Sequence, residues 1–175
     1  LPFEKVWYDV WKNIDNLTIR EQIAITTYIV NYINPDFTPA YIVRGDAYFT
    51  NKDYINALQD YTTAIEQQPN NAEIYYKRGL TYNYLKDFYP TAINDFKQAT
   101  DLNNNIANFW AEYSYALKFS HYGADEMLAK AIAINPQYKN FNYNELEQQR
   151  TTIVYSSALE KALFYSYIGN YFLAE

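Results

Sequence analysis

Aromatic residues recur along this chain at a fixed interval. Trp7, Tyr41, Tyr75 and Phe109 each stand 34 residues after the one before (7+34=41, 41+34=75, 75+34=109). Apolar stretches between them are separated by short polar turns such as Asn51–Asp53. A constant period of this size is typical of repeat proteins, in which each unit stacks on its neighbours. The pattern therefore predicts an array of paired helices.

Further positions repeat in step with these aromatics. After Tyr41 come Gly45, Tyr48, Ala57, Tyr61, Ala64 and Pro69, and after Tyr75 come Gly79, Tyr82, Ala92, Phe96 and Ala99. This succession resembles the tetratricopeptide repeat, most clearly over residues 38–102. The resemblance implies two antiparallel helices in each unit.

The spacing has a physical reason. Glycine has no side chain, so Gly45 and Gly79 allow the partner helix to approach closely, and Tyr61 fills the space between two alanines. Pro69 ends the second helix, because the residue before a proline is disfavoured in helical conformation.

The flanking units are less regular. We expect repeats at about 4–37, 38–71, 72–105 and 106–138, followed by C-terminal helices within 143–175. The segment from Ala162 to Phe172 resembles the first helix of another repeat, so either it caps the array or the chain is cut from a longer one. Its many aromatics favour a cut array or burial against another surface, since a cap is polar on its outer face. The predicted fold is all-α, a right-handed α-solenoid of about four helix pairs in one domain, 1–175, with one or two C-terminal helices.

Composition narrows the function. The net charge of −6 and the pI of about 4.8 argue against nucleic-acid binding, which requires clustered Lys and Arg. There is no Cys, which excludes thiol chemistry and disulfides, and no apolar run of membrane-spanning length. The chain begins at Leu1 without Met and looks like a processed or excised fragment, so compartment and localisation cannot be inferred.

Candidate chemistry is sparse. His121 is the only histidine and falls in a predicted turn, and the four glycines are too scattered for a phosphate-binding loop. We therefore expect no catalytic residues, metal or cofactor, and no enzymatic activity.

Two arginines occupy the same repeat position. Arg44 and Arg78 recur together with Asp60 and Asp95 on the partner helices. We interpret them as structural ion pairs that fix the register of the two helices, because the acids recur in step with the arginines. The alternative is an arginine pair that binds an anionic ligand.

The family resemblance also implies a binding groove, lined by residues of the first helix of each unit. Transferred to this chain, the groove positions are Tyr8, Lys12, Asp15, Ile42, Asp46, Phe49, Tyr76, Leu80, Asn83, Trp110, Ser114 and Leu117. This set is apolar and aromatic with few charges, and exposed apolar area commonly marks a partner site.

One family function is disfavoured by the residues present. Repeats that clamp the C-terminal carboxylate of heat-shock chaperones use Lys, Asn and Arg at the groove positions. A clamp that began at the second unit would here consist of Ile42, Asp46, Leu80, Ala107 and Ala111. One that began at the first unit would consist of Tyr8, Lys12, Asp46, Glu73 and Lys77.

We therefore predict a protein–protein interaction scaffold that binds a protein or peptide segment in an apolar-aromatic groove. The alternative is a structural or oligomerisation module within a larger protein, packing on neighbouring domains or on a copy of itself through the helix at 162–173. The residues do not identify the partner.

Overall fold

The structure is a computed structural model that describes residues 9–85, 88–120 and 123–149. Its α-helices are α2 (Ile19–Tyr28), α3 (Thr38–Thr50), α4 (Tyr54–Gln67), α5 (Ala72–Tyr84), α6 (Tyr89–Leu102), α7 (Ala107–Phe119), α8 (Asp125–Ile134) and α9 (Tyr143–Gln149). Short helical segments of other types cover Ile14–Asn16, Ile29–Ile33 and Pro136–Asn140. These described ranges contain no β-strand.

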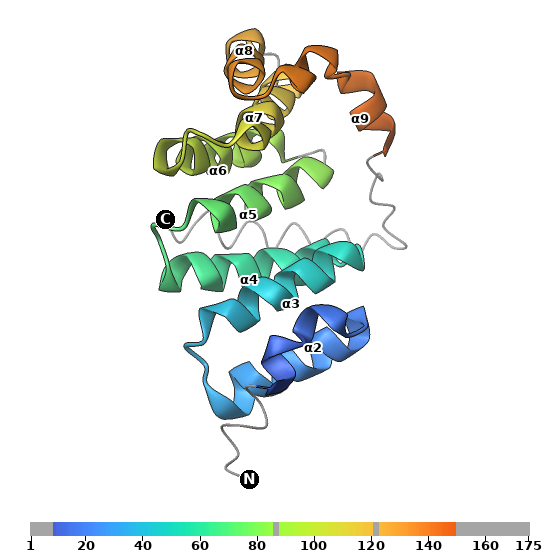
Figure 1. Cartoon of the computed structure of the whole chain (residues 1–175), viewed down its shortest axis with the longest axis vertical. Coiled ribbons are helices and arrows are strands. Elements are labelled where there is room, and N and C mark those ends of the chain that lie inside the picture. Colours follow the sequence, from blue (N-terminus) through green and yellow to red (C-terminus); the bar gives the residue numbers. More distant parts are fainter. Residues whose placement is uncertain (1–8, 86–87, 121–122, 150–175) are drawn as a thin grey trace.

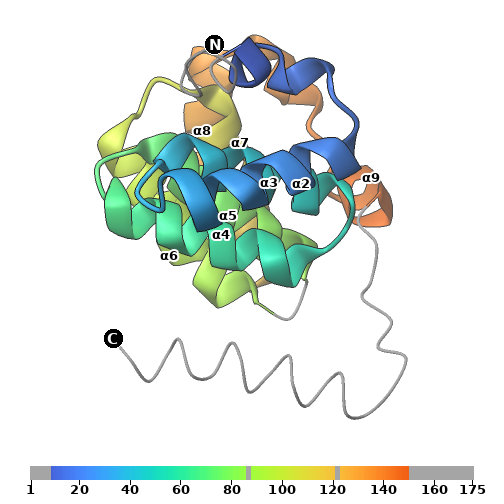
Figure 2. The same cartoon turned by 90° about the horizontal axis from the view of Figure 1, so that it is seen from below.

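The helices form a stack of pairs. Within the pairs, α3 packs on α4, α5 on α6 and α7 on α8, and successive pairs meet where α2 contacts α3, α4 contacts α5 and α6 contacts α7. Figure 1 shows the pairs in chain order along the long axis, and Figure 2 shows the same stack from its N-terminal end. The predicted right-handed α-solenoid is confirmed.

Local sequence signals set the helix boundaries. The Asp53 side chain accepts a hydrogen bond from the Asn56 backbone N–H at the start of α4, and Asn71 does the same for α5. Lys52, with φ of 61°, turns the chain between α3 and α4. α4 ends at Gln67, two residues before Pro69, as the proline predicts.

Each of the two regular repeats has one large aromatic at its centre. Tyr61 is 2% exposed and Phe96 is fully buried. Both lie where a glycine on the facing helix leaves room. A Cβ at Gly45 would stand 2.7 Å from Cε1 of Tyr61, and one at Gly79 would stand 3.1 Å from Cε1 of Phe96.

The fourth repeat and α9 continue the stack with other residues. Tyr143, at the start of α9, lies 34 residues after Phe109 and hydrogen bonds to Ser114 of α7. One repeat earlier, Asn83 of α5 contacts Glu112 of α7 at the same separation of 29 residues. α9 therefore contacts α7 much as α7 contacts α5. The sequence predicted a helix over 143–158 without a repeat pattern; Trp7, His121 and the motif at 162–173 lie outside the described residues.

We expect Gly45→Ala to lower the free energy of unfolding by about 1–3 kcal/mol, because the added methyl group meets a buried ring that has no space to move into. Gly79→Ala should cost less, since its contacts are longer. Urea unfolding monitored by circular dichroism measures both. Gly123→Ala is the control, because no atom lies within 4 Å of that Cβ position. Wild-type stability in Gly45→Ala would contradict the close-approach explanation.

Candidate functional site

The candidate groove face consists of the predicted groove residues on α3, α5 and α7. Ile42, Phe49 and Leu80 are partly exposed on this face. Ile42 packs against the buried cluster around Tyr61, and Phe49 makes an edge-on contact with Tyr84, 5.0 Å between ring centroids. These side chains have a fixed base and a solvent-accessible surface, which suits them to contact a partner.

The aromatics at the third and fourth repeats are held by neighbours. Tyr76 stacks on Phe109 with 4.6 Å between ring centroids, and its hydroxyl accepts a hydrogen bond from Asn108. Trp110 donates its indole N–H to the Asn104 carbonyl at 2.9 Å, and the Lys130 ammonium lies 4.6 Å from its ring centroid. Tyr76 and Trp110 are therefore part of the framework as well as of the face.

Two predicted groove residues are completely buried. Asn83 donates its amide to the Glu112 carboxylate at 3.0 Å, and Ser114 is covered by Tyr143 of α9. Neither contributes open surface, because the following first helix stacks over each of them. Lys12 is exposed, Leu117 is partly exposed, and Tyr8 lies outside the described residues.

An ion pair crosses the candidate groove face. The Lys77 ammonium donates to both carboxylate oxygens of Asp46 at 3.0 Å, and the Tyr61 hydroxyl donates to the same carboxylate at 2.7 Å. Burial, with a further contribution from the charge of Asp46, raises the pKa of Tyr61 above its ordinary value. Sequence reasoning missed this pair as a unit, although both residues were considered for the chaperone clamp.

The arginines form a repeated link between helices. Arg44 donates to both oxygens of Asp60, from Nε at 2.8 Å and from Nη2 at 2.7 Å. Its Nη1 donates to Thr27 of the preceding repeat at 3.2 Å. One repeat later, Arg78 makes the same contacts with Asp95 and Thr62. Each arginine thus joins its own second helix to that of the repeat before.

Burial dominates the energetics of these pairs. Burial raises the pKa of Asp60 above its ordinary value, and the hydrogen bonds and charge of Arg44 reverse this only in part. Burial alone would lower the pKa of Arg44, but Asp60 more than offsets it and the net pKa is raised. The desolvation cost falls on the carboxylate, so the pair orients the helices more than it adds net stability.

We expect Asp60→Ala to destabilise the fold by about 3–5 kcal/mol, because it leaves the guanidinium of Arg44, with a side chain only 14% exposed, without its carboxylate. The double variant Arg44→Met with Asp60→Leu should lie much closer to wild type, since it removes both charges. A double-mutant cycle on urea unfolding measures the coupling. Additive losses would show that the two side chains do not act as a pair.

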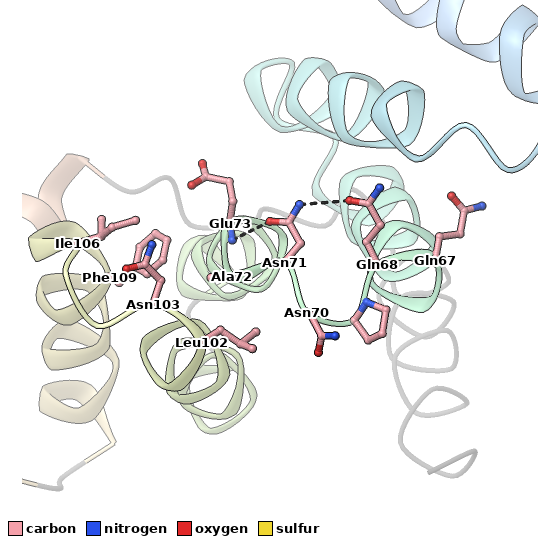
Figure 3. Close-up of a pocket in the computed structure, with 11 residues that line it drawn as sticks. Gln67, Gln68, Asn70, Asn71, Ala72, Glu73, Leu102, Asn103, Ile106 and Phe109 are labelled. Carbon is pink, nitrogen blue, oxygen red and sulfur yellow. Dashed lines mark hydrogen bonds between the residues drawn. The ribbon is translucent and has the colours of Figure 1, made fainter.

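A hollow of about 680 Å³ lies beside this face, between the α4–α5 and α6–α7 links. Figure 3 shows amide side chains of the first link on one side and Leu102 with Asn103 on the other. Its lining residues are Gln67, Gln68, Pro69, Asn70, Asn71, Ala72, Glu73, Leu102, Asn103, Ile106 and Phe109. None of the predicted groove residues lines it, and amide-rich links gave no signal that sequence reasoning recognised.

Two classes of site were searched for within the described ranges. There, no three His, Asp or Glu side chains gather in a way that could hold a metal ion. None of the helices in those ranges combines the length and apolar character that crossing a bilayer requires.

Paired helices stacked with a 34-residue period define a helical repeat protein. Residues 45–83 match the family model described as TPR repeat. A segment of 72 residues is 32% identical to Superkiller complex protein 3 of Mus musculus; the match covers 41% of this chain and 4% of that protein.

Solved structures agree with the fold. A crystal structure of MamA superposes with a TM-score of 0.66 at 18% identity, covering 74% of this chain and 75% of MamA. The first TPR domain of Spaghetti (RPAP3), solved with the HSP90 peptide SRMEEVD, gives 0.53 at 22% identity, covering 63% of this chain and 90% of that domain.

The chain belongs to the tetratricopeptide repeat family. This fold is that of a protein–protein interaction scaffold, and proteins with it are generally not catalysts.

Proposed function

We propose that this protein binds a segment of a partner protein on the candidate groove face. The observation that carries the proposal is the row of partly exposed apolar side chains on successive first helices, Ile42 and Phe49 on α3 and Leu80 on α5. Two aromatics of the face, Tyr76 and Trp110, add area that a partner can cover. Apolar anchors on a rigid base are the usual energetic centre of a protein interface.

Stacked first helices favour a particular kind of contact. They present their side chains at regular intervals along the array, so a helical or extended segment can place several anchors against them at once. The Asp46–Lys77 pair lies across this face and is satisfied internally. The partner therefore does not need to neutralise either charge, and apolar contact supplies most of the affinity.

We expect Leu80→Ser to weaken binding of a captured partner about tenfold, because it removes an apolar anchor without disturbing a described hydrogen bond. The measurement is affinity capture with the full chain, followed by titration of the identified partner by calorimetry. Ile134→Ser is the matched control, since Ile134 is an exposed apolar residue at the end of α8, away from the face. Equal affinity for both variants and wild type would reject the groove.

We also propose that the protein is not a clamp for chaperone carboxylates. A clamp that starts at the second repeat has Ile42, Asp46 and Leu80 at the required positions, and Ala107 and Ala111 are both buried. In the other register, the Lys77 ammonium is already held by Asp46. A peptide carboxylate would have to displace that contact.

The peptide SRMEEVD tests this directly. We expect its Kd for this chain to exceed about 1 mM, which corresponds to less than about 4 kcal/mol of binding free energy. The first TPR domain of RPAP3, whose structure holds this peptide, is the positive control. Micromolar binding to this chain would show that the clamp assignment was wrongly rejected.

Self-association was the alternative function, and it rests on the helix predicted at 162–173, outside the described residues. It stays a prediction, as does the absence of catalytic activity. Light scattering on the full chain distinguishes a self-associating module from a monomer that binds another protein.

A further inference from the structure

We propose that the hollow between the α4–α5 and α6–α7 links is a second peptide-binding site. Its ligand is an extended segment that carries a lysine or arginine next to an apolar residue. This inference goes beyond the proposed function, because none of the predicted groove residues lines the hollow.

The size and position of the hollow suit an extended chain. At about 680 Å³ it falls within the range of about 300–1,000 Å³ that ligand pockets occupy. Two links of similar role, from successive repeats, form its opposite walls (Figure 3). A segment lying between them would contact two repeats at once.

The apolar part of the ligand is indicated by Leu102. This residue ends α6 and is 41% exposed, which is high for a leucine in a folded protein. Its side chain extends toward the Asn70 side of the hollow in Figure 3. Together with Ile106 and Phe109 it provides an apolar floor on which one aliphatic side chain can lie.

Charge indicates the basic residue. Glu73 is the only charged residue among those that line the hollow, and its side chain is 54% exposed. Its nearest cation, Lys77, lies 3.8 Å away and already donates to both oxygens of Asp46 at 3.0 Å. A carboxylate with this weak contact retains capacity to accept hydrogen bonds from a basic side chain.

The amide side chains indicate an extended backbone. The Gln68 carbonyl oxygen accepts from Asn71, and the Asn103 carbonyl oxygen accepts from the Asn105 N–H. The amide nitrogens of Gln68 and Asn103 then point their donors toward other acceptors. Backbone carbonyls of an extended segment supply such acceptors at regular intervals, whereas a helical segment uses its own internally.

The experiment selects peptides from a random phage-displayed library on the immobilised full chain. Synthetic versions of the enriched peptides are then titrated against variants. We expect enriched sequences to combine Lys or Arg with a neighbouring apolar residue, and their Kd to rise about threefold to tenfold in Glu73→Gln and in Leu102→Ser.

Each variant has a matched control. Asp125 is an exposed acid in the first turn of α8, as Glu73 is in the first turn of α5, so Asp125→Asn tests for loss of charge alone. Ile134 ends α8 as Leu102 ends α6 and is equally exposed, so Ile134→Ser tests for loss of apolar surface alone. Both controls should leave the Kd unchanged.

Three results would overturn the inference: enrichment of acidic peptides, affinities that do not change in Glu73→Gln and Leu102→Ser, or no enrichment at all. Peptides whose affinity falls only in Leu80→Ser would overturn it while supporting the groove. Peptides that respond to Glu73→Gln and Leu102→Ser but not to Leu80→Ser would support the second site independently of the groove.

Discussion

The structure depends on how closely the two helices of a repeat can approach. At Gly45 and Gly79 the first helix has no side chain, and the ring of Tyr61 or Phe96 occupies the space. Because that ring is buried on all sides, it fixes the distance between the helices and their relative rotation. The residues that face outward from the first helix are then determined. The candidate groove face exists because this inner contact leaves Ile42, Phe49 and Leu80 no alternative orientation.

A second constraint acts between repeats. The links from Arg44 to Thr27 and from Arg78 to Thr62 join successive second helices, while Lys77 and Asp46 join successive first helices. Links on both sides of the stack restrict its curvature. A partner that binds across several repeats therefore meets a surface that is already ordered, which reduces the entropy lost on binding.

Much of this arrangement could be predicted from the sequence, for reasons that differ between features. The 34-residue period, the glycines and the Arg–Asp spacing depend on contacts within one repeat, and these follow from helix geometry. Whether Asn83 and Ser114 were open could not be predicted, because Glu112 and Tyr143 of later helices cover them. The hollow was missed for a similar reason. Its lining comes from two links that are about 35 residues apart in sequence, and amides in turns usually signal caps, as Asn71 does here.

The arginine links also define which repeats are interchangeable parts. The second and third repeats each carry an arginine that faces a threonine of the preceding unit, so either could follow the other with its junction intact. The fourth repeat breaks the rule: the position 34 residues after Arg78 is Glu112, which accepts its hydrogen bond from Asn83 instead. This unit is keyed to one neighbour. The order of repeats is thus written into their junctions, and an ancestral duplication of identical units has become an array whose last described junction can be assembled in only one sequence.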